Sequence, residues 1–155
     1  MLKRIAVDLC VLTNGRVMPK IPEHNLSTQQ QNCWGFTAEA VGWMKGRAWL
    51  GPRRMEEYLK KYTVVIRKHE VRPGDLAVYR LNEAGCSFFG NCVGHLWHTA
   101  IIVKPDALVL HKPGSLPIVL EPFEICFLDA ADVTFHRVTE ERPEEKEPLR
   151  LIINQ

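Results

Sequence analysis

The sequence predicts an α+β fold in which N-terminal helices pack on an antiparallel β-sheet. Two observations support this fold class. Segments with apolar residues at helical spacing come first, between residues 33 and 61, and short β-branched runs with a period of two follow from Thr63 onward. Helices followed by strands is the order typical of α+β domains. The 155 residues suit one domain, which we place at residues 1–139.

The composition is that of a globular protein. Hydrophobic residues make up 46% of the chain and charged residues 25%. Twenty Lys and Arg against eighteen Asp and Glu give a net charge of +2, too balanced for a protein that mainly binds nucleic acid phosphates. No apolar run approaches the roughly 20 residues of a membrane-spanning helix. We therefore expect neither nucleic acid nor a membrane as a partner.

The N-terminal segment, residues 1–20, is expected to form a short hairpin. The apolar stretch from Ile5 to Leu12 is predicted as a strand that leads into Asn14-Gly15, a pair typical of hairpin turns. Asp8 interrupts this stretch and no small-x-small cleavage site follows it, so we expect synthesis in the cytoplasm without a signal peptide. Delivery to the outside by phage or secretion machinery stays open. Residues 21–32 lack periodicity and are expected to form a loop.

Two helices are expected next. The first runs from Cys33 to about Lys45, with apolar residues at helical spacing, Asn32 as its N-cap and Gly46 at its end. The second is amphipathic and runs from about Arg53 to Lys61. One face of this second helix carries the apolar residues Met55, Tyr58, Leu59 and Tyr62.

The remaining elements are predicted as strands. A turn at Arg72–Asp75 separates the first two, and Lys104–Ala107 has the residues of a type I turn, which makes a hairpin of its flanking strands. A loop is expected from Leu81 to Trp97. Residues 140–155 are expected to form a charged, solvated tail. The expected strands are 63–66, 76–80, 99–103, 108–111, 118–120 and 133–138.

Cys33 is the residue with the most reactive predicted surroundings. The chain has five cysteines, an odd number, so at least one lies outside any intramolecular disulfide. In the first turn of a helix, the macrodipole and the unpaired N–H groups favour a thiolate. We therefore expect Cys33 to have the lowest pKa among the thiols of this chain. The same N–H groups can hold the oxyanion of a tetrahedral intermediate. The alternative is a buried structural thiol.

Two histidines lie in the predicted hairpin. If Lys104 pairs with Ala107, then Ala100 faces His111, and His98 becomes the diagonal neighbour of His111 on the same face. A slip of one residue would place the two histidines on opposite faces. A cysteine at a helix start and two histidines on one face are the nucleophile, base and orienting group of a thiol acyl-transfer enzyme. Two ordinary core or surface histidines are the alternative.

Four motifs in order resemble a known family. They are Gln-Asn-Cys-Trp-Gly-Phe at 31–36, Arg-Pro-Gly-Asp-Leu-Ala-Val-Tyr at 72–79, Trp-His-Thr-Ala-Ile-Ile-Val at 97–103 and Leu-His-Lys-Pro-Gly at 110–114. Over about residues 29–138 the chain resembles the papain-like cysteine peptidases and amidases of the NlpC and CHAP kind. The resemblance implies a papain-like (NlpC-type) fold with Cys33 as nucleophile, His98 as base and His111 as the third polar residue. It also implies hydrolysis of amide bonds in peptidoglycan stem peptides, with no metal and no other cofactor.

Two features depart from that family pattern. The segment from Leu81 to Trp97 is longer than a compact member needs, and no upstream tyrosine or glutamine clearly matches the residue that assists the oxyanion. Gln29, Gln30 and Gln31 are candidates for that role. The expected partner is a peptide or a peptidoglycan fragment as substrate, and a protein partner such as an inhibitor stays open. A protein or small-amide deamidase or acyltransferase with the same residues is an alternative function.

A second cluster could instead bind zinc. Cys86, Cys92, His95 and His98 form C-x5-C-x2-H-x2-H, four zinc-capable ligands within thirteen residues. The gap between Cys92 and His95 suits one metal, but the gap between the two cysteines is unlike the usual tight knuckle. A zinc-stabilised binding module in which Cys33 is inert is therefore the non-enzymatic alternative. Two ordinary thiols, or a disulfide between Cys86 and Cys92, explain the cluster without a metal.

Overall fold

The computed structural model of the chain describes residues 31–44, 48–90, 92–113, 118–123 and 129–139. The predicted hairpin at 1–20, nearly all of the loop predicted at 21–32, and the charged tail lie outside these described residues. Cys10 and Cys126 lie outside them as well.

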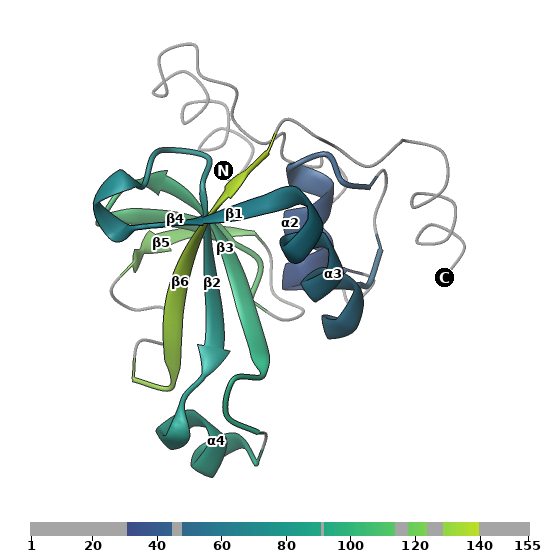
Figure 1. The fold of residues 1–155 in the computed structure, drawn as a ribbon, viewed down its shortest axis with the longest axis vertical. Helices are drawn as coiled ribbons and strands as arrows, with labels where there is room; N and C mark the ends of the chain where they lie inside the picture. Colours follow the sequence, from purple (N-terminus) through teal and green to yellow (C-terminus); the bar gives the residue numbers. More distant parts are fainter. Residues whose placement is uncertain (1–30, 45–47, 91, 114–117, 124–128, 140–155) are drawn as a thin grey trace.

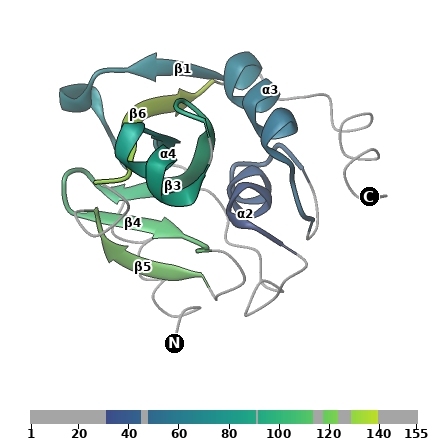
Figure 2. The same cartoon turned by 90° about the horizontal axis from the view of Figure 1, so that it is seen from below.

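A six-stranded sheet dominates the described part of the chain (Figures 1 and 2). The strand order is β1-β6-β2-β3-β4-β5, and each of these pairings is antiparallel. The C-terminal strand of the sheet thus lies between the first two, while β2 to β5 follow one another as neighbours. The strands are β1 (Thr63–Ile66), β2 (Leu76–Leu81), β3 (Leu96–Lys104), β4 (Leu108–His111), β5 (Val119–Pro122) and β6 (Ala131–Val138).

Three short α-helices accompany the sheet in the described residues: α2 (Cys33–Ala40), α3 (Pro52–Tyr62) and α4 (Glu83–Phe89). A 3-10 turn, η1, spans Lys68–Glu70. Figure 1 shows α2 and α3 together at one side of the sheet, and α4 at the far end of β2 and β3. None of the described helices combines the length and apolar character that crossing a membrane requires.

The predicted fold class is wrong. We expected an α+β, papain-like layout with a layer of N-terminal helices packed on the sheet, whereas the described residues form a mostly antiparallel six-stranded sheet with three short helices. The first helix shows the reason. It ends at Ala40 and not near Lys45, because Gly42 takes a φ of 85°, which terminates the helix. The longest of the described helices has 11 residues, so strands form most of the described fold.

Apolar side chains are buried on both faces of the sheet. Successive residues of a strand point to opposite faces, so the runs at 76–79 and 100–103 supply both sides at once. On one face, strand residues such as Leu76 and Ile101 share a cluster with Phe36 of α2 and Met55 of α3. The other face carries a second cluster, made of Ala77, Tyr79, Ala100, Ile102, Val109 and Ala131.

The register of β3 and β4 confirms the predicted relation between the two histidines. Ile101 faces Leu110, so one further step along the hairpin places Ala100 opposite His111. His98 is then the diagonal neighbour of His111 on the same face. A β-bulge close to the turn changes the pairing there, but the register is the predicted one from Ile101 toward His98.

Candidate active site

Cys33 is the first residue of α2, where the sequence predicts it. The side-chain oxygen of Asn32 caps the helix by accepting the N–H of Gly35 at 2.9 Å. The same side chain also joins the helix start to the chain at Leu50. Its Nδ2 donates to the Leu50 carbonyl at 2.6 Å, and its Oδ1 accepts the Leu50 N–H at 3.1 Å. These buried hydrogen bonds fix the backbone that carries the thiol.

Hydrogen bonds also hold α2 against β3. The Thr37 hydroxyl donates to the Cys33 carbonyl at 2.9 Å and lies 2.8 Å from the Thr99 hydroxyl. Because a hydroxyl has one hydrogen, Thr99 is the donor in the second contact. The Cys33 thiol itself interacts with the backbone N–H groups of Thr99, Trp34 and Cys33. The start of α2 therefore contacts β3, the strand that carries His98.

The direction of the Thr99 N–H shows where the thiol lies relative to the strands. The N–H of Ile102 donates to the Asp75 carbonyl at 2.8 Å, on the β2 side of β3. Since N–H groups alternate along a strand, the Thr99 N–H points to the other side, toward β4. The thiol therefore lies where β4 ends, after His111. Among the described side chains, the thiol makes no hydrogen bond to the His98 ring.

The two histidines and a glutamate form a chain of buried contacts. His98 Nε2 lies 2.6 Å from His111 Nδ1, and the rings meet edge to face with centroids 4.9 Å apart. His111 Nε2 lies 2.7 Å from Oε2 of Glu121 on β5. His98 is 3% exposed and His111 is 2% exposed. The structure thus brings together the two predicted histidines and adds a carboxylate.

Sequence reasoning missed Glu121. Its position in the sheet explains the contact, because Glu121 faces Val109 and is therefore the diagonal neighbour of His111 on the same face. The available signal was an acidic residue in the otherwise apolar run from Ile118 to Pro122. That signal gains meaning only when the pairing of β4 with β5 is known.

Burial controls the protonation of the thiol. Burial raises the pKa of Cys33 to about 12, and the three backbone N–H groups and the charge of Lys112 oppose this rise only in part. The expectation of an unusually low pKa is wrong for this structure, because Cys33 is only 7% exposed and desolvation disfavours the thiolate.

Burial also keeps the histidines neutral. Burial, together with the charge of a protonated His111, lowers the pKa of His98 to about 3. The pKa of His111 is lowered as well by burial, with Glu121 acting in the opposite direction. The resting site therefore holds a neutral thiol and neutral imidazoles.

One of the three glutamines considered for the oxyanion lies in the described residues. Gln31 is buried, and its amide nitrogen donates to the Glu39 carboxylate at 2.7 Å. Gln29 and Gln30 lie outside the described residues. The N–H groups of Trp34 and Thr99 already face the thiol, and these are the donors that an oxyanion at this position would meet.

The four residues of the zinc alternative do not gather. His98 is paired with His111, and Cys86 and Cys92 are free thiols, so the disulfide alternative is wrong. Cys86 lies in α4, a helix within the segment that was expected to be a loop. Among the described side chains, no group of three or more His, Cys, Asp or Glu is arranged to hold a metal ion.

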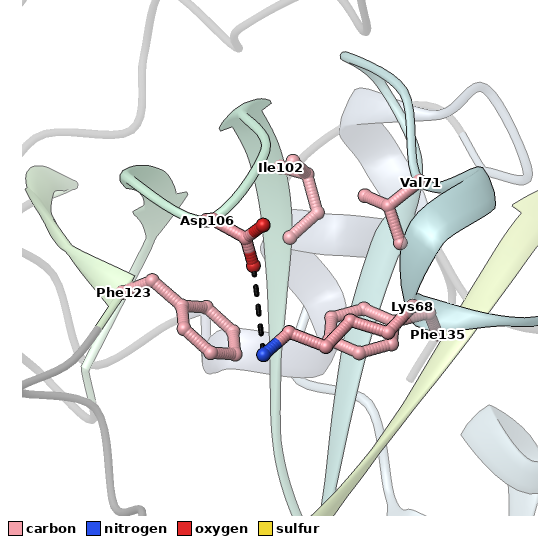
Figure 3. Close-up of a pocket in the computed structure, with 6 residues that line it drawn as sticks. All are labelled: Lys68, Val71, Ile102, Asp106, Phe123 and Phe135. Atoms are coloured by element: carbon pink, nitrogen blue, oxygen red, sulfur yellow. Dashed lines mark ion pairs between the residues drawn. The ribbon is translucent and has the colours of Figure 1, made fainter.

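A small hollow lies on the sheet face that carries the second cluster (Figure 3). Lys68 Nζ and Asp106 Oδ1 lie 3.7 Å apart there, among apolar side chains. Its cavity volume of about 10 Å³ is room for one water molecule, too little for a peptide. None of the three predicted catalytic residues lines it. Its lining residues are Lys68, Val71, Ile102, Asp106, Phe123 and Phe135.

No protein-family model matches the chain, and no curated protein matches it either.

Proposed function

We propose that this chain is a cysteine-dependent amidase or endopeptidase. In this proposal Cys33 is the nucleophile, His98 is the base and His111 orients the base. The observation that carries the proposal is the 2.6 Å contact between His98 Nε2 and His111 Nδ1. The thiol of Cys33, at a helix start, interacts with the backbone N–H of Thr99, the residue that follows His98. A nucleophile, a base and a group that orients the base are the parts that thiol acyl transfer requires.

The proposed reaction begins with the thiol. Its proton passes to Nδ1 of His98 while Sγ bonds to the carbonyl carbon of the amide. That proton then passes to the leaving nitrogen as the C–N bond breaks, and a thioester remains. Water gives one proton to Nδ1 of His98 while its oxygen bonds to the acyl carbon. The C–S bond then breaks and the proton returns to sulfur, so the net reaction is hydrolysis of one amide bond.

The protonation states favour a concerted first step. The pKa of Cys33 is about 12 and that of His98 is about 3, so a free thiolate beside an imidazolium is disfavoured in the resting protein. Proton transfer must therefore accompany formation of the C–S bond. The N–H groups of Trp34 and Thr99, which face the thiol, can stabilise the oxyanion that forms at the same time.

Peptidoglycan stem peptides are the proposed substrate, on the basis of the motif resemblance. A deamidase or an acyltransferase would use the same three residues on another amide or with another acceptor. The product separates these reactions, because hydrolysis adds water to a cut chain, deamidation releases ammonia, and transfer leaves the acyl group on the acceptor.

The first prediction concerns this activity. Purified peptidoglycan digested with the wild-type chain should yield stem-peptide fragments in which each cut has gained one water, measured by mass spectrometry. Cys33→Ala should yield none. His98→Ala should lower the rate by about 10²–10⁴-fold, the usual range for loss of a general base.

Cys92→Ala is the matched control, because it removes an exposed thiol that has no role in the proposed reaction. It should cut at the wild-type rate. Cleavage that persists in Cys33→Ala would contradict the proposed nucleophile. Ammonia release from amides, with uncut peptidoglycan, would replace the proposed substrate by that of a deamidase.

A further inference from the structure

Glu121 contacts His111, one of the three predicted catalytic residues. We propose that Glu121 is a positioning residue that fixes the tautomers of His111 and His98, so that Nδ1 is the unprotonated nitrogen of His98. This inference rests on the proposed function, since it describes how the base of that reaction is set before substrate binds.

The first step is that Glu121 of β5 contacts the ring of His111 through its carboxylate. Glu121 Oε2 lies 2.7 Å from Nε2 of His111, a ring that is 2% exposed. A carboxylate at neutral pH has no hydrogen to donate, so it can only accept. The hydrogen in this contact must therefore belong to Nε2 of His111.

The second step follows from the number of protons on a neutral imidazole. A neutral ring carries a single N–H, so a hydrogen on Nε2 of His111 leaves its Nδ1 as an acceptor. His98 Nε2 lies 2.6 Å from that Nδ1, and this contact needs one hydrogen between the two nitrogens. His98 must supply it from Nε2. Its Nδ1 is then the unprotonated nitrogen, which is the form that a base requires.

The third step is that the contact between the two rings is satisfied by either of two tautomers. Without the carboxylate, Nδ1–H of His111 can donate to Nε2 of His98 and satisfy the same contact. In that arrangement the proton of His98 lies on Nδ1, and the ring cannot accept the proton of Cys33 there. The carboxylate of Glu121 excludes this second arrangement. In it, the carboxylate oxygen and the unprotonated Nε2 of His111 would face each other across 2.7 Å with no hydrogen between them.

Nitrogen NMR of the histidine rings in the full chain tests this inference directly. In wild-type protein at neutral pH, His98 and His111 should both carry the hydrogen on Nε2. In Glu121→Ala both tautomers should be populated. Glu121→Gln has nearly the same shape but can donate as well as accept, so it should also show both tautomers and guards against a folding defect in Glu121→Ala.

Asp106→Asn is the matched control. It removes the carboxylate at the turn between β3 and β4 and leaves both histidines unchanged. Asparagine tolerates the φ of 58° at this position. Its ring tautomers should be those of the wild type. In the activity assay, kcat of the two Glu121 variants should fall about 10–100-fold with little change in KM, the range found when the hydrogen-bond partner of a metal-ligating histidine is removed.

The outcomes separate the two proposals. Wild-type tautomers in both Glu121 variants would overturn the inference, whatever the activity. Mixed tautomers with reduced kcat support it. Mixed tautomers in a protein whose wild type hydrolyses no amide would support the positioning of His98 by Glu121 and overturn the proposed function.

Discussion

Cys33 shows how two local influences oppose each other at one residue. Its place at a helix start, among backbone N–H groups, favours a thiolate, and the charge of Lys112 acts in the same direction. Burial acts against both and dominates, because a side chain that is 7% exposed loses most of the hydration of its charged form. The site therefore depends on His98 as a base, and the tautomer of His98 matters as much as its position.

Thiol alkylation tests this balance. In the native protein at neutral pH, iodoacetamide should modify Cys92 well before Cys33, because Cys92 is exposed and burial raises the pKa of Cys33 to about 12. Peptide mass spectrometry gives the rate at each residue. In denaturant the two rates should become similar, since burial is the cause. Faster modification of Cys33 in the native protein would show an activated thiol and contradict the burial argument.

At the scale of elements, the start of α2 depends on a close backbone approach. A Cβ atom at Gly35 would lie 1.9 Å from the carbonyl oxygen of Ala48. No side chain fits there unless the backbone moves, so glycine lets the helix approach the segment that Asn32 binds at Leu50. The position of the Cys33 thiol thus depends on packing between segments that are distant in sequence.

Gly35→Ala is expected to destabilise the protein even though alanine favours helices. The clash with Ala48 should cost about 1–3 kcal/mol of unfolding free energy, the usual range for overpacking. Urea unfolding gives the value. Gly51→Ala, where a Cβ meets no atom within 4 Å, is the control and should change stability much less. Equal stability of Gly35→Ala and wild type would show that the two segments can separate freely.

At the scale of the whole molecule, buried histidines couple the fold to pH. His136 of β6 contacts the Thr63 hydroxyl of β1 at 2.9 Å through Nδ1, and the Thr134 hydroxyl at 2.9 Å through Nε2. Burial and the nearby charge of Arg80 lower the pKa of His136 to about 4, although Glu56 acts in the opposite direction. With His98 near the end of the sheet, two regions of the molecule therefore hold a histidine that resists protonation.

Stability should fall as the pH falls from 6.5 toward 4. The unfolded chain binds protons at its histidines near pH 6.5, whereas folded His98 and His136 bind them only near pH 3 and 4. The unfolded state then holds more protons, so the unfolding free energy drops by about 1.4 kcal/mol per pH unit for each such histidine. Urea unfolding across this range measures the slope.

Two variants identify the source of that slope. His136→Asn should reduce the slope by about 1.4 kcal/mol per pH unit, because one buried histidine has been removed. His69→Asn, which makes the same substitution at an exposed histidine, is the control. A wild-type stability that does not vary over this range would contradict the burial of these rings.

Local patterns predicted several elements closely. The strands at 63–66 and 108–111 have the predicted bounds, and α3 at 52–62 differs from the prediction by one residue at each end. Period two and turn residues act over a few neighbours, so the sequence alone carries them. By contrast, α4 has seven residues, and its brief apolar spacing provides no comparable periodic signal.

The sequence by itself determined the cap of α2 at Asn32 and the hairpin register that places His98 beside His111, because both depend on residues close together in the chain. Only the tertiary structure decided the fold class, the place of β6 between β1 and β2, and the contact of Glu121 with His111. It also decided the protonation of Cys33, where burial outweighs the helix start. Strand order and desolvation depend on which distant segments meet, and no local pattern specifies that.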